Sequence, residues 1–60
     1  TMTPQEKAKE LVEEIMKIQG IQYWQSQMCA LICCDEVLGY MGSDRGHEFW
    51  TSVKKEIEGL

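Results

Sequence analysis

The chain has 60 residues and a formal net charge of -4 at pH 7. This length makes one domain at most, residues 1–60, and a domain this small usually needs disulfides, a metal or oligomerisation for stability. The acidic balance argues against a general DNA- or RNA-binding protein, which needs a basic face to neutralise phosphates. It does not exclude one small anionic ligand in a local pocket.

Targeting signals and cysteine usage indicate a cytoplasmic protein. The N-terminal residues are polar and acidic, so we expect no signal peptide. No apolar run approaches the ~18 residues of a membrane span, and we expect no membrane partner. The 3 cysteines crowd into positions 29–34, which is not a disulfide framework. Free thiols are typical of a reducing compartment.

The first predicted helix covers residues 4–18. Thr3 and Glu6 have the spacing of a capping box, and Pro4 suits the first helical position. Gly20 is a natural stop because it can adopt the left-handed conformation. The apolar positions follow helical spacing, and they are Ala8, Leu11, Val12 and Ile15.

The second predicted helix covers residues 21–41 and has two apolar stripes on nearly opposite sides. One stripe consists of Trp24, Met28, Leu31, Ile32 and Leu38. The other consists of Ala30, Cys34, Val37 and Met41. A helix that is apolar on most of its circumference is buried on most of it. We therefore expect this helix to be central, with one side covered by the other two helices and the second stripe, that of Ala30 and Cys34, covered by a partner subunit in a homo-oligomer.

The third predicted helix covers residues 46–59 and follows a turn at residues 42–46. The turn is rich in residues that cap helices or accept positive φ. The apolar stripe of the helix is Phe49, Trp50, Val53, Ile57 and Leu60. The predicted fold class is therefore all-α, with three short helices joined by short connections that favour antiparallel neighbours.

Residue chemistry argues against an enzyme or a metal site. Cys29, Cys33 and His47 offer three zinc ligands, but the fourth is missing. The cysteines are instead interpreted as small packing residues. Asp35 and Glu36 are adjacent, so on a helix they diverge by about 100° and cannot act on one bond together. No phosphate-binding glycine-rich loop is present, and we expect no cofactor.

Asp35 requires a partner because it falls on the same face as Met28 and Ile32. A buried carboxylate must be paired, hydrogen-bonded or close to a helix N-terminus. We expect a structural cap or salt bridge that holds the third helix against the second. The donors available to it are backbone N–H groups of the turn, Arg45 and His47. The alternative is a contact with a ligand.

Three blocks of the sequence resemble a known group of proteins. They are Thr3-Pro4-x-Glu6-Lys7-Ala8-x-Glu10-Leu11-Val12, then Cys29-Ala30-Leu31-Ile32 with Asp35-Glu36, and Trp50-x-x-Val53-Lys54-x-Glu56-Ile57-Glu58. This pattern resembles very small helical proteins encoded by phages and prophages of gut bacteria. The chain departs from it at Cys33-Cys34 and at Asp44-Arg45-Gly46-His47. The resemblance implies a phage accessory protein in the host cytoplasm, and such proteins often antagonise host defence.

Aromatic and basic residues provide the best candidate ligand site. Aromatic faces stack on bases, and cations pair with phosphates. The candidate ligand-binding residues are Tyr23, Trp24, Tyr40, Arg45, His47, Trp50 and Lys54. Under the simpler interpretation, Trp24 and Trp50 belong to the core. The functional hypothesis is a non-catalytic sponge that sequesters a cyclic nucleotide signal where subunits meet. The alternative is a protein that binds and inhibits a host defence or regulatory protein.

Overall fold

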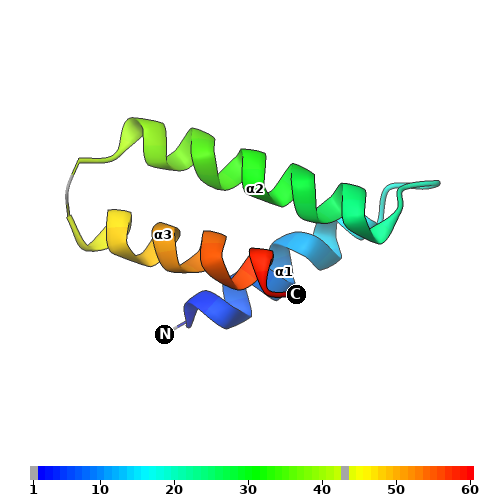
Figure 1. Cartoon of the computed structure of the whole chain (residues 1–60), viewed down its shortest axis with the longest axis horizontal. Helices are drawn as coiled ribbons and strands as arrows, with labels where there is room; N and C mark the ends of the chain where they lie inside the picture. Colours follow the sequence, from blue (N-terminus) through cyan, green and yellow to red (C-terminus); the bar gives the residue numbers. More distant parts are fainter. Residues whose placement is uncertain (1, 43) are drawn as a thin grey trace.

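The computed structural model describes residues 2–42 and 44–60, which form three α-helices. These are α1 (Pro4–Met16), α2 (Tyr23–Tyr40) and α3 (Arg45–Glu58). In Figure 1, α2 and α3 run side by side in opposite directions, and α1 crosses them from one side. The prediction of an all-α fold with three helices is confirmed.

Local capping determines where α1 begins. The backbone N–H of Thr3 donates to Glu6 Oε1 at 2.8 Å, and the backbone N–H of Glu6 donates to Thr3 Oγ1 at 3.2 Å. The predicted capping box is therefore present. The helix ends at Met16, two residues earlier than predicted. Gly20 has φ 85° and takes the left-handed conformation that the sequence predicted for it.

The other two helices differ from the predicted bounds by one or two residues. The backbone N–H of Gln22 donates to Gln25 Oε1 at 2.9 Å, and this contact fixes the start of α2 at Tyr23 instead of residue 21. Asp44 Oδ1 accepts the backbone N–H of His47 at 3.0 Å, so α3 begins at Arg45 instead of residue 46. The predicted turn at residues 42–46 includes Ser43, which lies outside the described residues.

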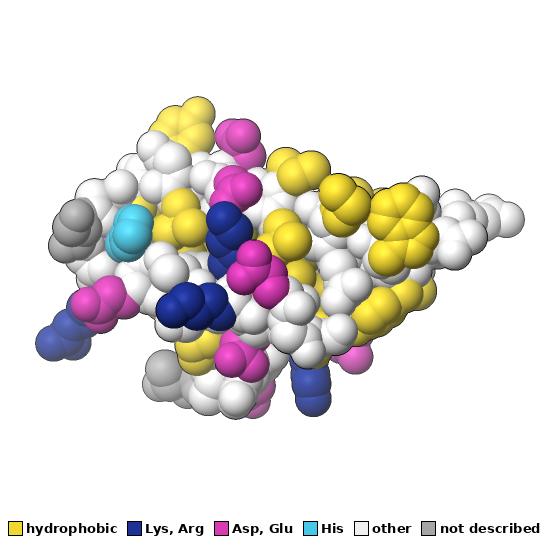
Figure 2. Space-filling model, in the orientation of Figure 1, with side chains coloured by type: hydrophobic (Ala, Val, Ile, Leu, Met, Phe, Trp, Pro, Cys, Tyr) yellow, Lys and Arg dark blue, Asp and Glu magenta, His cyan; other side chains and the backbone are white. Residues whose placement is uncertain are grey.

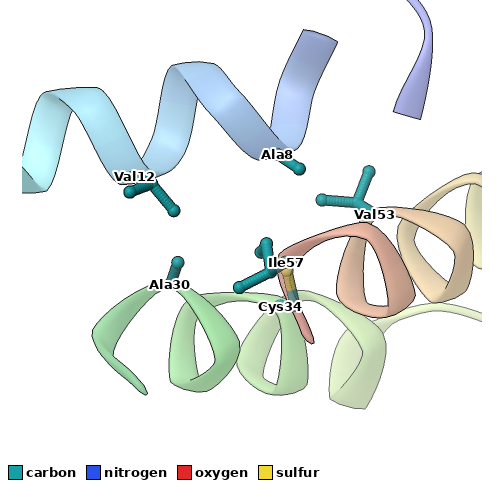
Figure 3. Close-up of a cluster of buried hydrophobic side chains, with 6 residues drawn as sticks. All are labelled: Ala8, Val12, Ala30, Cys34, Val53 and Ile57. Atoms are coloured by element: carbon teal, nitrogen blue, oxygen red, sulfur yellow. The ribbon is translucent and has the colours of Figure 1, made fainter. Parts of the chain in front are cut away.

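The core consists of six small or medium side chains, two from each helix and spaced four residues apart. They are Ala8 and Val12 of α1, Ala30 and Cys34 of α2, and Val53 and Ile57 of α3. Figure 3 shows the three pairs converging between the helices. Small side chains permit close approach of the helices, and such interiors are packed without voids. Leu11, Ile15, Leu31, Phe49 and Trp50 pack against this core from its border.

The structure corrects the predicted placement of α2. Its stripe of Ala30 and Cys34 faces α1 and α3, with the buried Ser26 in line. The stripe of larger residues, with Trp24, Met28 and Ile32, faces outward. Every pair of helices is in contact, and α1 and α3 cover one side of α2 while its other side is exposed. The reason is size, because only the small residues of α2 allow both neighbours to approach.

Polar contacts fix α2 and α1 to α3. Gln27 Nε2 donates to the carbonyl oxygen of Leu60 at 3.1 Å, across α2 and the end of α3. Lys7 Nζ lies 6.0 Å from the ring centroid of Trp50, which joins α1 to α3. None of the helices, over the part of the chain that the structure describes, combines the length and hydropathy that a membrane crossing requires.

Candidate binding surface

Three large apolar side chains of α2 project away from the bundle. Trp24 is 57% exposed, Met28 is 55% exposed and Ile32 is 59% exposed. They are four residues apart, so they form one stripe along the helix, which we call the α2 face. Figure 2 shows hydrophobic side chains gathered along the half of α2 nearest the α1–α2 loop, at the right of the view. A contiguous exposed apolar patch is a candidate interaction site.

The α2 face lies within a stretch of the chain that has no charge. Positions 18–34 contain no Asp, Glu, Lys, Arg or His. In Figure 2 the acidic and basic side chains gather over the middle and left of the molecule instead. Depletion of charge at the centre of a patch is the compositional mark of protein–protein interfaces. The surface is therefore suited to another apolar protein surface.

Two open grooves flank the α2 face, and both are lined by Trp24 and Met28. The larger, of about 490 Å³, extends toward the α1–α2 loop and includes Ile18, Ile21 and Cys29. The smaller, of about 330 Å³, extends toward α3 and includes Leu31, Ile57 and Glu58. No cationic side chain lines either groove. An anionic ligand would find no cationic partner there, whereas apolar side chains of a second protein would fit.

The structure places the seven predicted ligand-binding residues in three separate regions. Tyr23 and Trp24 are at the start of α2, and Tyr40 is at its end. At a rise of 1.5 Å per residue these ends are about 25 Å apart. Arg45 and His47 occupy the first turn of α3, at the same end of the bundle as Tyr40. Tyr40 is 92% exposed.

Trp50 and Lys54 lie in the third region, on α3, and face different neighbours. Trp50 is half-buried, with its ring 5.9 Å from that of Phe49 and edge-on to it. Lys54 faces α2, where its ammonium is 2.8 Å from Asp35 Oδ1. The hydrogen bond to Asp35 raises the pKa of Lys54 above its ordinary value. A single chain therefore places Tyr23 beside Trp24 in α2 and places Tyr40, Arg45 and His47 at one end of the bundle, but it does not assemble all seven into one site.

Asp35 has the structural role that the sequence favoured, with a different partner. It forms a salt bridge that connects α2 to α3, and the cation is Lys54 rather than Arg45 or His47. The expected burial is wrong, because the side chain of Asp35 is 55% exposed. The carboxylate thus sits at the margin of the α2 face, where water still solvates it.

The three cysteines divide into one packing residue and two exposed thiols. Cys34 is buried in the core, and this burial raises the pKa of its thiol. Cys29 and Cys33 are exposed, so the prediction that the cysteines serve packing is wrong for these two. Within residues 2–42 and 44–60, no three His, Cys, Asp or Glu side chains are grouped closely enough to hold a metal ion.

Met28 and Ile32 are the surface residues that the sequence reasoning missed, since it counted them as core. Trp24 was named as a ligand contact, but its exposed position also overturns its simpler interpretation as core. The signal that identifies the surface is the absence of charge over positions 18–34. Comparisons with protein-family models, with curated proteins and with solved structures return no match for this chain.

Proposed function

We propose that this chain is a non-enzymatic binding protein that works as a homo-oligomer, with the α2 face as its subunit interface. The observation that carries the proposal is the exposed stripe of Trp24, Met28 and Ile32 inside a charge-free stretch. Leaving these side chains in water forgoes hydrophobic stabilisation that a small domain needs. A second copy of the same uncharged face supplies the missing contact.

Charge favours a second copy over the other candidate occupants. An anionic membrane surface attracts helices with Lys or Arg beside the apolar face, and positions 18–34 have neither. Two copies of a chain with net charge -4 repel each other wherever their acidic surfaces meet. The α2 face is the part of the surface where they can approach without that repulsion.

The energies predict association of moderate strength. Burying the exposed half of a large apolar side chain contributes about 1 kcal/mol. The six side chains of two α2 faces then contribute roughly 6 kcal/mol, against an association cost of about 4 kcal/mol or more. The six side chains therefore exceed the lower bound of that cost by only a small margin. Border residues such as Ile18 and Leu31 must therefore join the interface, and the assembly depends on protein concentration.

Sedimentation over a concentration series tests this proposal with two matched variants. Met28→Glu places a charge in the centre of the α2 face, whereas Met16→Glu places the same charge at the end of α1. Both methionines are exposed, so neither change disturbs the core. We expect the wild type and Met16→Glu to associate and Met28→Glu to remain monomeric, with equal helicity by circular dichroism. A monomeric wild type, or equal association of all three, would overturn the proposal.

A cyclic nucleotide sponge is the second candidate function. One observation favours it, namely that the nearly fully exposed ring of Tyr40 lies at the same end of the bundle as Arg45 and His47. An exposed aromatic ring at the same end of the bundle as an arginine suits a base and its phosphate. The resemblance to phage accessory proteins supports the same anti-defence role, in the host cytoplasm, against either a nucleotide signal or a host protein.

Calorimetry against a panel of cyclic di- and trinucleotides tests the second candidate. We expect heat of binding with the wild type that is lost in Tyr40→Ala, while Tyr23→Ala tests whether the distant aromatic takes part. No heat with any nucleotide would leave inhibition of a host protein as the remaining anti-defence role. A pull-down from host lysate, compared between wild type and Tyr40→Ala, then measures that role.

A further inference from the structure

We propose that two copies pair their α2 faces in antiparallel orientation, around a two-fold axis that passes close to Met28. This inference rests on the proposed function, since it assumes that the α2 face is the subunit interface. It adds the stoichiometry, the orientation and the register of that interface. Three features of α2 support it. They are the distribution of its acidic residues, the sizes of its side chains and the partial positive charge of its N-terminus.

The acidic residues of α2 disfavour a parallel pair. Asp35 and Glu36 are both exposed and lie about one helical turn beyond Ile32, the last residue of the stripe. A parallel pair would place Glu36 at the same height as Glu36 of the partner copy, and the two Asp35 residues likewise. Like charges held close together are destabilising. Because Lys54 neutralises only Asp35, the repulsion between the two Glu36 carboxylates would remain.

An antiparallel pair turns the same charges into an attraction. The N-terminus of a helix carries a partial positive charge that favours acidic groups nearby. The first turn of α2 contains no acidic residue of its own. With Met28 at the axis, Glu36 of one copy lies level with position 20 of the partner copy. That position is three residues before Tyr23 of the partner copy, or about 4.5 Å along the helix axis at a rise of 1.5 Å per residue. Each Glu36 would therefore complement the start of the other α2.

Side-chain sizes favour the same register. Around an axis at Met28, Trp24 of one copy lies opposite Ile32 of the other, so a large ring meets a smaller side chain. Interdigitation of large and small side chains produces dense packing. Met28 meets Met28 of the partner copy, and methionine adapts its shape readily to such self-contact. The uncharged residues of both copies then cover one another over the whole stripe.

The register also brings distant aromatic residues closer together. In one chain Tyr23 and Tyr40 are at opposite ends of α2. In the antiparallel pair, Tyr40 and Tyr23 of the partner copy are separated by only about 10 Å along the helix axis. Residues of two chains thus contribute aromatic rings to each end of the assembly, as a ligand site shared between subunits requires.

Substitution of Glu36 tests the orientation, because the antiparallel and parallel pairs predict opposite changes in the dissociation constant of the dimer. In the antiparallel pair Glu36→Gln removes an attraction and raises the dissociation constant of the dimer several-fold. In a parallel pair it removes a repulsion and lowers the dissociation constant. Glu13→Gln, on the exposed face of α1, makes the same change in net charge as a control. Sedimentation at low salt measures all three proteins, and tighter association of Glu36→Gln overturns the inference.

Cross-linking of the native thiols tests the register. In the antiparallel pair the two Cys29 residues are offset by about 3 Å along the axis, whereas the two Cys33 residues are offset by about 15 Å. A short bismaleimide should therefore link chains through Cys29 and not through Cys33. Cys29→Ser should abolish the linked dimer and Cys33→Ser should retain it. Equal linking by both thiols in an associated protein overturns the inference alone, whereas a monomeric wild type overturns the proposed interface as well.

Discussion

Lys54 Nζ and Asp35 Oδ1 lie 2.8 Å apart and connect α3 to α2 at the margin of the α2 face. Both side chains remain partly in water, with 37% and 55% of their areas exposed. Ion pairs of this kind contribute little to stability, because the solvent screens them and the long side chains lose freedom. The salt bridge therefore orients the two helices more than it stabilises them.

Asp35→Asn should consequently give a folded protein whose melting temperature differs little from that of the wild type. Thermal unfolding by circular dichroism measures this. The deletion of a core side chain, as in Val53→Ala, is the comparison and should lower the melting temperature far more. If Asp35→Asn instead unfolds the protein, the salt bridge has a larger role than its exposure allows.

Truncation of one isoleucine in the core and one on the α2 face should have different effects on stability and on association. Ile57 is fully buried and Ile32 is 59% exposed. Ile57→Ala should lower the free energy of unfolding by about 2–5 kcal/mol because it leaves a cavity. Ile32→Ala should leave the stability of the monomer nearly unchanged while it weakens association. Urea denaturation at low protein concentration measures the free energy of unfolding of both variants. An equal decrease for both would contradict the assignment of Ile57 to the core and Ile32 to the α2 face.

The thiols should react with Ellman's reagent in two classes. Cys29 and Cys33 are exposed and should react rapidly at neutral pH. Cys34 is buried, and burial raises its pKa, so the reactive thiolate is scarce as well as inaccessible. Its reaction should follow the rate of unfolding, and urea should accelerate it. The Cys34→Ala variant should retain only the rapid class. Reaction of all three thiols at one rate would contradict the packing of Cys34.

Protonation of Glu6 at acidic pH should weaken the capping box at the start of α1. The hydrogen bond from the backbone N–H of Thr3 lowers the pKa of Glu6 below its ordinary value of 4.5. A carboxyl whose folded pKa is depressed stabilises the protein above its unfolded pKa, and that stabilisation disappears as the pH falls through the folded pKa. The melting temperature of the wild type should therefore fall more steeply than that of Glu6→Gln as the pH drops below 4.5. Parallel slopes for the two proteins would contradict this role.

The fold was predictable from local signals. The capping box at Thr3 and Glu6 and the positive φ of Gly20 follow from residue types whose backbone preferences do not depend on tertiary structure. The starts of α2 and α3 were less predictable, because they depend on which nearby polar residue caps the helix, and Gln22 and Asp44 do so. These contacts shift each boundary by one or two residues.

The inward side of α2 could not be predicted from hydrophobicity. Both stripes are apolar, so the pattern alone does not tell which of them faces α1 and α3. The small side chains of Ala30 and Cys34 decide it, since they let the helices approach closely. For the same reason hydrophobicity favours Met28 as a core residue and leaves Trp24 as either a core residue or a ligand contact, whereas both side chains are exposed in the assembled bundle.

Native mass spectrometry of the protein purified from cells tests most directly whether the α2 face is a subunit interface. It reports the number of chains in the assembly and the mass of any retained molecule. We predict a species of twice the chain mass that dissociates on dilution and is absent in Met28→Glu. A wild-type species of one chain mass, at every concentration up to the millimolar range, would contradict the interface.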